Sequence, residues 1–197
     1  VLFYIKMTTK DLYRIFQKHP SICTDTRKIK NGSLFFALKG EKFNGNKFAE
    51  KAIKDGASYA VVDDNTLNHS QYIKVDNVLK SLQSLSKFHR SKLLKTKIIA
   101  LTGSNGKTTT KELINEVLKT KFNVSSTIGN LNNHIGVPLT LLKIDPLAEF
   151  AIIEMGANHL NEIKFLTELV NPDFGLITNF GKAHLEGFGS LKGVIKG

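Results

Sequence analysis

The segment from Gly103 to Thr109 combines the residue types and the spacing that bind nucleoside phosphates. Its glycines let backbone N–H groups turn toward phosphate oxygens, and a helix beginning there would add the positive end of its dipole. Lys107 would reach the outer phosphates as a point charge, and Thr108 would place its hydroxyl on Mg²⁺. We therefore predict that ATP phosphates bind Gly103, Ser104, Asn105, Gly106, Lys107, Thr108 and Thr109.

The spacing within this loop narrows the class of phosphate-binding protein. Two residues separate Gly103 from Gly106, whereas four separate the glycines of the common Walker A motif. The shorter loop argues against a generic NTPase and for a particular subset of such proteins. The alternative is a glycine turn before a helix with a lysine present by chance. The apolar run before the loop, together with Lys107 and three threonines, disfavours that alternative.

Two further side chains that could do chemistry follow predicted strands. Glu154 comes directly after the apolar run 150–153, and His184 follows the strand predicted over 174–179. Both would lie at the carboxyl edge of the sheet, where ligands bind in open α/β folds. A carboxylate at that edge could hold Mg²⁺ beside the phosphate loop. On position alone, a surface glutamate and a structural histidine remain the alternatives.

Strand-like and helix-like segments alternate along the chain, which predicts an α/β fold with a mostly parallel sheet covered by helices on both faces. The predicted strands are 33–38, 59–62, 97–101, 122–126, 149–155 and 174–179. The predicted helices begin at Thr8 or Thr9 and then cover 47–55, 77–93, the segment after the phosphate loop, 134–143 and 160–170. The helix after the loop is expected to bury Leu113, Ile114, Val117 and Leu118.

A domain boundary is expected at about residues 93–96, where the second series of strands begins. Residues 1–94 would then form a small α/β domain. Residues 95–197 would form a P-loop-type α/β domain that is incomplete, because its last helix is only beginning at Ser190.

Composition limits the kind of partner. The formal charge is +11, but the lysines are scattered at helix-surface spacing, which favours a solvated surface over nucleic-acid binding. The apolar runs are shorter than the roughly 18 residues of a membrane-spanning helix, and residues 1–5 do not resemble a signal peptide. Cys23 is the single cysteine, which fits the reducing cytoplasm, and a catalytic role for it is disfavoured because no motif surrounds it.

Several motifs resemble those of one family. The loop Thr102–Thr109 is similar to that of Mur ligases and folylpolyglutamate synthases. The stretches Thr24–Arg27, Gly32–Gly40 and Phe43–Phe48 look like the uridine-binding N-terminal domain of the later Mur ligases. Three further segments resemble the branch of the family that adds D-alanyl-D-alanine: Gly129–Leu142, Glu154–Asn158 with Glu162-Ile163, and Thr178–Ser190.

This resemblance implies an activity and a set of site residues. The reaction would be the ATP-dependent joining of D-alanyl-D-alanine to UDP-N-acetylmuramoyl-tripeptide through an acyl phosphate, carried out in the cytoplasm by a monomer. The resemblance assigns catalysis to Lys107, Glu154 and His184, and magnesium binding to Thr108, Glu154 and His184. It also implies that the UDP-linked precursor is bound by Asp25, Thr26, Arg27, Asn130, Asn132 and Asn133.

Some of these assignments leave an alternative open. Arg27 would pair with the diphosphate and Thr26 with uracil or phosphate. An Asx-type turn with a solvated arginine is the other interpretation of this stretch, and the three asparagines could equally be turn residues.

The chain departs from the family pattern in two ways. Asn161 stands where the family commonly has glycine, and a local change in helix geometry is expected there. The carbamylated lysine that helps to bind a second magnesium would fall just past Gly197, with Lys196 at the neighbouring basic position. Because the rest of this domain and the C-terminal domain are also absent, the fragment is expected to bind nucleotide or UDP without ligation.

Three rival functions are compatible with the same residues. One is a different carboxylate–amine ligase of the same superfamily, either another Mur step or folate polyglutamylation. Another is a nucleotide-binding module without ligase chemistry. The third is a nucleic-acid-binding protein that uses the positive charge, for which affinity should fall steeply with salt.

Overall fold

The computed structural model describes residues 7–181 and 185–196, and it divides the chain into two compact units. Unit 1 ends at Phe88 and unit 2 begins at His89. The sequence predicted a boundary at 93–96, a few residues later. The division falls earlier because Leu93 belongs to the core of unit 2 and the side chain of Arg90 bonds to carbonyls of unit 2.

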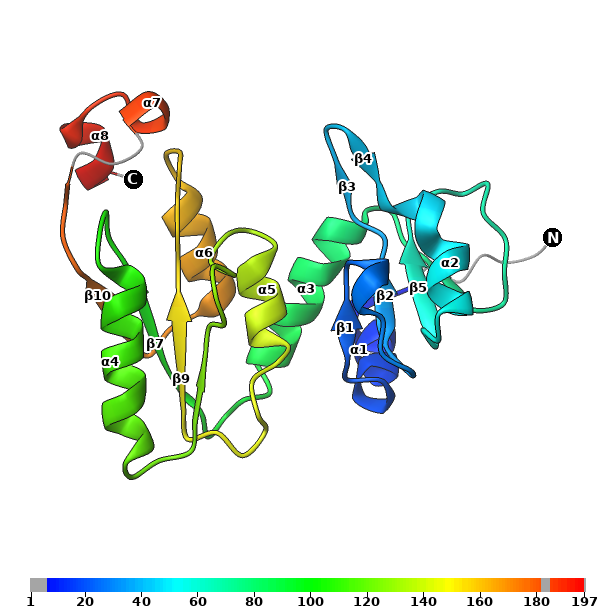
Figure 1. Ribbon diagram of the computed structural model, residues 1–197, viewed down its shortest axis with the longest axis horizontal. Coiled ribbons are helices and arrows are strands. Elements are labelled where there is room, and N and C mark those ends of the chain that lie inside the picture. The colour runs from blue at the N-terminus through cyan, green and yellow to red at the C-terminus, as the bar shows by residue number, and fades with distance from the viewer. Residues whose placement is uncertain (1–6, 182–184, 197) are drawn as a thin grey trace. The chain divides into compact units, whose positions relative to one another are not determined.

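Unit 1 is built on a four-stranded parallel sheet in the order β1-β2-β5-β6 (Figure 1). Its strands are β1 (Ile22–Cys23), β2 (Leu34–Phe36), β5 (Tyr59–Val62) and β6 (Tyr72–Lys74), and a hairpin is formed by β3 (Lys39–Gly40) and β4 (Phe43–Asn44). Its helices are α1 (Thr9–Lys18), α2 (Ala49–Lys54), most of α3 (Val78–Arg90), and the 3-10 turns η1 (Thr26–Lys28) and η2 (Gly45–Phe48).

Local chemistry explains the elements of unit 1 that the sequence predicted. Thr8 caps α1, because its side chain accepts a hydrogen bond from the N–H of Asp11 at 3.2 Å. Leu12 and Phe16 are then buried on one face of the helix, as their spacing predicted. The strands β1 and β6 and the hairpin were missed. They are two or three residues long, which is too short to show a periodic pattern.

Unit 2 has a second four-stranded parallel sheet, in the order β10-β7-β9-β8. Its strands are β7 (Lys97–Thr102), β8 (Val124–Ser126), β9 (Phe150–Glu154) and β10 (Phe174–Ile177). Its helices are α4 (Lys107–Lys119), α5 (Gly136–Leu141), α6 (Glu162–Val170), α7 (Leu185–Phe188) and α8 (Leu191–Lys196). In Figure 1, α4 covers one face of this sheet, and α5 and α6 cover the other. The predicted α/β class with mostly parallel sheets is confirmed.

The core of unit 2 lies between the sheet and the helices α5 and α6. Alternate residues of the central strands point into it, as in any strand covered by a helix layer. Its main members are Ile98, Ala100, Val137, Leu141, Ala151, Ile153, Leu166, Leu169 and Val170. These side chains are buried, and the parallel pairing of the strands places their carboxyl ends at one edge of the sheet.

The face of α4 that meets the sheet differs in part from the predicted one: Ile114 and Leu118 are half-buried, but the other two residues of the predicted face are not buried. Leu113 and Val117 were expected in the core, yet they are 65% and 69% exposed. Lys111 and Asn115 are buried instead, at 1% and 2% exposure. The reason is the start of the helix: Thr108 turns toward the end of β9, and positions three and seven residues later lie on that same face.

Asn161 was expected to change the local helix geometry. It adopts φ +66° directly before α6, in the left-handed region that glycine enters freely. Asparagine tolerates this region better than most residues. The substitution of glycine by asparagine therefore requires no altered helix start.

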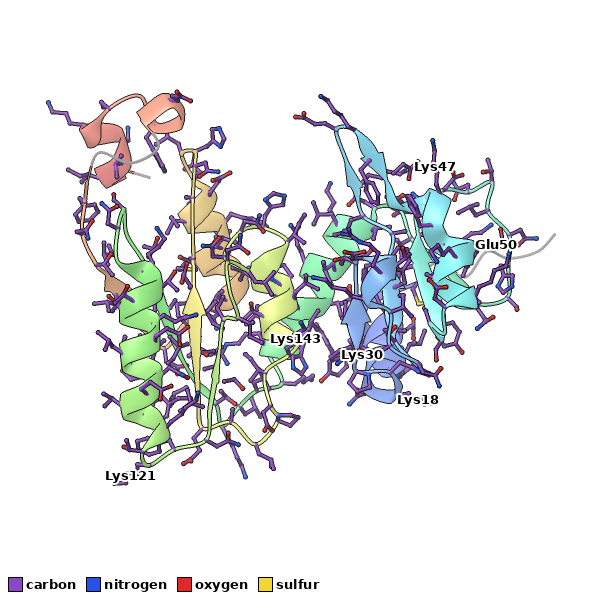
Figure 2. All side chains as sticks on the ribbon, viewed as in Figure 1. Lys18, Lys30, Lys47, Glu50, Lys121 and Lys143 are labelled. Atoms are coloured by element: carbon purple, nitrogen blue, oxygen red, sulfur yellow. The ribbon has the colours of Figure 1, made fainter. Side chains whose placement is uncertain are left out.

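The charged surface is spread over both units. Figure 2 labels Lys18, Lys30, Lys47, Lys121 and Lys143, each in a different element or loop. In the residues that the structure describes, no helix is long and apolar enough to cross a membrane.

Arg90 ties the start of unit 2 to the end of α6. Its Nε donates to Val170 O at 3.0 Å and its Nη2 to Asn171 O at 2.9 Å, so it satisfies carbonyls at the C-terminus of that helix. Nη2 also pairs with Asp173, at 3.1 Å. The N–H of Ile98, followed by Lys97 and Arg90, holds the pKa of Asp173 below its usual range.

We predict that Arg90→Met lowers the free energy of unfolding by about 2–4 kcal/mol, because it leaves these carbonyls without their charged donor while keeping the apolar stem. Chemical denaturation measures this change. Arg14→Met is the matched control: Arg14 is 76% exposed and pairs with Asp11 on α1, so the expected change is below about 0.5 kcal/mol. Equal effects of the two substitutions would contradict the capping role of Arg90.

Candidate functional site

The loop predicted to bind phosphate (residues 103–109, here still called the phosphate loop) connects β7 to α4 and includes the first turn of that helix, and its backbone requires glycine at two positions. Gly106 has φ +76° and immediately precedes the first helical residue. Gly103 has φ +137°, and a Cβ atom there would overlap the hydroxyl of Thr178. The sequence predicted both glycines from the need to bend the chain around phosphates. The structure adds that Gly103 also permits close packing of the loop against the chain after β10.

The segment that follows β10, residues 178–181, is hydrogen-bonded to the phosphate loop. The hydroxyl of Thr178 donates to Asn105 O at 2.6 Å, and Nδ2 of Asn179 donates to the same oxygen at 3.0 Å. The N–H of Ser104 donates to Asn179 O, and that of Asn105 donates to Asn179 Oδ1. Ser104 also exchanges two hydrogen bonds with the backbone of Gly181. Thr178 and Asn179 were not among the predicted site residues, although their place directly after a strand was an available signal.

This arrangement separates the roles of the predicted loop residues. Since the N–H groups of Ser104 and Asn105 are bonded to Asn179, these two residues shape the loop. The N–H groups of Lys107, Thr108 and Thr109 belong to the first turn of α4, where a helix has no internal acceptor for them. They are therefore the donors best placed for an anion.

Lys107 reaches back over the loop. Its Nζ donates to Gly103 O at 2.7 Å and lies 3.4 Å from Ser104 O. Both acceptors are neutral carbonyls, so the positive charge remains available to a phosphate. Lys107 also lines a cavity of about 230 Å³ beside the loop, with Ile163 and Phe180 in its wall.

Glu154 is the last residue of β9 and is only 2% exposed. Its Oε2 accepts a hydrogen bond from the hydroxyl of Thr108 at 3.0 Å, and its Oε1 accepts one from Nδ2 of Asn132 at 2.8 Å. Its own N–H donates to Oγ1 of Thr127 at 3.0 Å. The carboxylate thus emerges at the carboxyl edge of the sheet, as its position after a strand predicted, and lies next to the phosphate loop.

The geometry around Glu154 fits a divalent cation. Both side-chain partners of this buried carboxylate are neutral groups, and burying a charge without a countercharge is costly. Mg²⁺ prefers hard oxygen ligands and commonly binds one or two protein groups together with phosphate oxygens. Thr108 and Glu154 provide such a pair of oxygens. Among residues 7–181 and 185–196, no group of three or more His, Cys, Asp or Glu side chains that could hold a metal ion is found, at Glu154 or at any other place, and His184 lies outside the described residues.

The three asparagines of the Gly129–Leu142 segment are not equivalent. Asn132 contacts Glu154, and its backbone oxygen accepts from the N–H of Gly156 at 2.7 Å. Asn133 accepts the N–H groups of Ile135 and Gly136 with its side chain, so it shapes the turn before α5. Asn130 is exposed. Of the three, Asn132 is the asparagine whose side chain contacts Glu154.

In unit 1, Asp25, Thr26 and Arg27 form an Asx-type turn. Asp25 Oδ1 accepts the N–H of Arg27 at 3.0 Å, and Asp25 Oδ2 pairs with Nη2 of the same arginine at 2.7 Å. These hydrogen bonds lower the pKa of Asp25 to about 2. The side chain of Arg27 is 85% exposed, so its guanidinium faces solvent. The turn geometry that the sequence left open as an alternative is thus present, and a role for Arg27 in binding remains a prediction.

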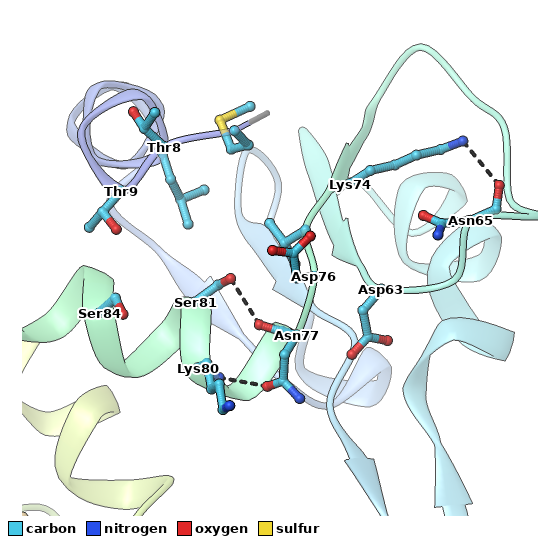
Figure 3. A pocket seen from close by; sticks show the side chains of 13 residues that line it. Thr8, Thr9, Asp63, Asn65, Lys74, Asp76, Asn77, Lys80, Ser81 and Ser84 are labelled. Atoms are coloured by element: carbon cyan, nitrogen blue, oxygen red, sulfur yellow. Dashed lines mark hydrogen bonds between the residues drawn. The ribbon is translucent and has the colours of Figure 1, made fainter. Parts of the chain in front are cut away.

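A cavity of about 610 Å³ lies elsewhere in unit 1 (Figure 3). It is found at the carboxyl ends of β5 and β6 and at the N-terminal ends of α1 and α3. Its polar lining includes Thr8, Thr9, Asp63, Asn65, Lys74, Asp76, Asn77, Lys80, Ser81 and Ser84. Asp25, Thr26 and Arg27 do not line it. The sequence did not predict this cavity, because its residues come from three separate stretches of the chain and form no motif.

Comparisons with known proteins identify the family of this chain. The family description "Mur ligase middle domain" matches residues 101–197, and "Mur ligase family, catalytic domain" matches residues 20–90. The UDP-N-acetylmuramoyl-tripeptide–D-alanyl-D-alanine ligase of Bacillus subtilis is 44% identical over 88% of this chain and 38% of its own length. The Haemophilus influenzae protein of the same name is 42% identical, over 98% of this chain and 45% of its own. The chain belongs to the Mur ligase family and spans less than half the length of these relatives.

Solved structures support the same fold. MurF from Acinetobacter baumannii has a TM-score of 0.86 at 34% identity, covering 95% of this chain and 44% of that one. MurF from Thermotoga maritima, solved in complex with ADP, has a TM-score of 0.81 at 30% identity, covering 90% and 41%. A diaminopimelate-adding ligase is 20% identical with a TM-score of 0.55, which shows likeness of fold alone.

Proposed function

We propose that this chain is the nucleotide-binding and precursor-binding part of a cytoplasmic ATP-dependent ligase that joins D-alanyl-D-alanine to UDP-N-acetylmuramoyl-tripeptide. The observation that carries the proposal is the contact between Thr108 of the phosphate loop and the buried carboxylate of Glu154, with Lys107 over the same loop. The names of the Bacillus and Haemophilus relatives supply the substrates.

The chemistry follows from carboxylate activation. The carboxylate of the tripeptide attacks the γ-phosphate of ATP, which forms an acyl phosphate and releases ADP. The free amine of D-alanyl-D-alanine then attacks the acyl carbon, and phosphate leaves through a tetrahedral intermediate. Little covalent chemistry falls to the protein, so its contribution is positioning and charge neutralisation.

The described residues have distinct tasks in this scheme. Lys107 and the first-turn N–H groups of α4 hold the outer phosphates and neutralise their charge. Thr108 and Glu154 would hold Mg²⁺, which supplies further neutralisation of phosphate charge when it is bound. Asn132 orients the carboxylate of Glu154 through its 2.8 Å hydrogen bond. His184, which lies outside the described residues, is proposed from the sequence alone as a ligand for a second magnesium ion.

The proposal is tested by following ADP release from the protein in its longest natural form. Release that depends on both UDP-N-acetylmuramoyl-tripeptide and D-alanyl-D-alanine is the expected result. Release with another amine or with a folate acceptor would move the step within the superfamily. No release with any of these substrates would leave a nucleotide-binding module. The 197-residue chain alone is expected to bind nucleotide without ligation.

We propose separately that the UDP-linked precursor binds unit 1 through its diphosphate, which would pair with Arg27. A solvent-facing guanidinium can pair with a diphosphate through charge-assisted hydrogen bonds. We expect Arg27→Ala to weaken UDP binding by about 10-fold or more, as measured by isothermal titration calorimetry.

Two further variants show whether this effect is local. Arg14→Ala also removes an exposed arginine paired with an aspartate, and it should leave UDP affinity unchanged. Lys80→Ala changes the lining of the 610 Å³ cavity. If Lys80→Ala weakens UDP binding and Arg27→Ala does not, the precursor lies in that cavity and the assignment of Arg27 is wrong.

A further inference from the structure

Lys111 is a buried charge that the proposed function does not use. It lies on α4, one turn after the phosphate loop, and it is 1% exposed. Lysine is almost never buried to this degree unless it is paired. Its Nζ donates to Thr127 O at 2.7 Å and forms an ion pair with Glu112 at 2.7 Å. Glu112 is 55% exposed, so its carboxylate is near solvent while the ammonium is not.

Thr127, the acceptor of that bond, is itself 1% exposed and fully bonded. Its N–H donates to Ile152 O at 3.0 Å, which continues the pairing of β8 with β9. Its hydroxyl oxygen accepts the N–H of Glu154 at 3.0 Å. Its carbonyl oxygen receives Lys111. Thr127 therefore connects the ammonium of Lys111 to the backbone of the residue that faces the phosphate loop.

These bonds complete a closed ring between α4 and the end of β9. On one side, the hydroxyl of Thr108 bonds directly to the carboxylate of Glu154 at 3.0 Å. On the other side, Lys111 bonds to Thr127, and Thr127 bonds to the N–H of Glu154. Thr108 and Lys111 are three residues apart on α4, so they lie on the same face of the helix. Two attachments on one face set both the rotation of the helix and its distance from the strand.

We propose that Lys111 is a positioning residue that, through Thr127, holds Thr108 and Glu154 at the separation needed to bind a divalent cation together with a nucleoside phosphate. This inference rests on the proposed function, because it concerns the same pair of oxygens. If Lys111 only filled space in the core, an apolar side chain of the same volume would serve equally well. The ammonium adds a charge-assisted hydrogen bond to a buried carbonyl, which is stronger and more directional than apolar contact.

The test compares Lys111→Met with two variants of the surrounding charges. Methionine fills the same space but cannot donate to Thr127 O. Glu112→Gln removes the ion-pair partner of Lys111 and leaves the bond to Thr127. Lys119→Met removes a half-exposed lysine from the same helix. Binding of a fluorescent ADP analogue is titrated with Mg²⁺ on the protein in its longest natural form, and unfolding is measured on the same samples.

Lys111→Met is expected to raise the Mg²⁺ concentration for half-maximal nucleotide binding by about 10-fold or more, since groups that orient metal ligands commonly have this effect. Nucleotide binding without Mg²⁺ should change by less than about twofold. Lys119→Met should behave as the unsubstituted protein does. Glu112→Gln keeps the bond of Lys111 to Thr127 O, so it should keep the same Mg²⁺ dependence even though the loss of the ion pair lowers the free energy of unfolding. Lys111→Arg retains a donor for Thr127 O and should recover part of the Mg²⁺ affinity.

Two results would overturn the inference. One is an unchanged Mg²⁺ dependence in folded Lys111→Met. The other is an equal loss of binding with and without Mg²⁺, which would indicate a general structural role. If Lys111→Met does not fold, Thr127→Val decides the matter, because it removes the acceptor of the Glu154 N–H and should shift the Mg²⁺ dependence in the same direction. Absence of Mg²⁺-dependent binding in the unsubstituted protein would instead overturn the proposed function.

Discussion

Lys107→Ala is expected to lower the rate of ADP formation by about 10³-fold or more in the protein's longest natural form, while the fold stays intact. The ammonium lies over the loop within 2.7 Å of Gly103 O, where the outer phosphates of a nucleotide would be bound. Removing a single group that stabilises developing charge typically costs about 10²–10³ in rate. Here the group also contributes to ATP binding, so the loss should be at the upper end.

The structural effect of the same substitution should be small. The acceptors of Lys107 are carbonyls of its own loop, and the loop is fastened independently by Thr178 and Asn179. We expect the free energy of unfolding to change by less than about 1 kcal/mol. Lys107→Arg should also be inactive, because a planar guanidinium does not substitute for a compact ammonium in a tight loop.

Lys121→Ala provides the control for a general effect of charge. Lys121 lies just past the other end of α4 and is exposed. Its removal should leave both ADP formation and nucleotide affinity unchanged. Near-normal ligation by the Lys107 variant, in an assay where the unsubstituted protein is active, would show that Lys107 is not the phosphate-binding residue.

Glu154→Gln is expected to lower the rate of ADP formation by nearly as large a factor, and to make that rate depend on a higher Mg²⁺ concentration. Glutamine keeps the shape of the side chain and can still accept a hydrogen bond from Thr108, but it removes the negative charge that a divalent cation requires. We expect ADP formation to fall by about 10²–10³-fold at low millimolar Mg²⁺, with partial recovery as Mg²⁺ is raised. A steady-state Mg²⁺ titration at saturating ATP measures both quantities.

The opposite end of the same strand offers the matched control for this substitution. Glu149 directly precedes β9, is exposed, and accepts the N–H of Asn123 at 3.1 Å. Glu149→Gln should therefore leave the Mg²⁺ dependence unchanged. If both variants respond alike, or if Glu154→Gln shows a normal Mg²⁺ titration, the magnesium assignment of Glu154 is wrong.

The phosphate loop could be predicted from sequence because its geometry is local. A short apolar strand, glycines at positions of positive φ and a helix start are encoded within about ten consecutive residues. The position of Glu154 was also accessible, since the carboxyl ends of parallel strands share one edge of a sheet. The α/β class followed from the alternation of strands and helices. The likeness to solved MurF structures agrees with the predicted α/β class.

The partners across the sheet could not be predicted in the same way. The bonds of Asn179 to the phosphate loop and of Asn132 to Glu154 join segments more than twenty residues apart in sequence. Such pairings depend on the strand order β10-β7-β9-β8, which no local pattern specifies. The same holds for the cavity of Figure 3, whose lining comes from separate elements of unit 1.

The orientation of α4 shows most clearly what the sequence predicts and what only tertiary contacts determine. By itself, the sequence determined that residues after the loop form a helix, and its apolar residues indicated a buried side that included Leu113 and Val117. The tertiary structure decided otherwise: Lys111 and Asn115 face the sheet, and Leu113 and Val117 are exposed. The rotation of the helix is set where it begins, by the bond of Thr108 to Glu154 and by that of Lys111 to Thr127. The hydrophobic periodicity predicted that a helix forms, but the side of α4 that faces the sheet depends on polar contacts with residues far away in the sequence.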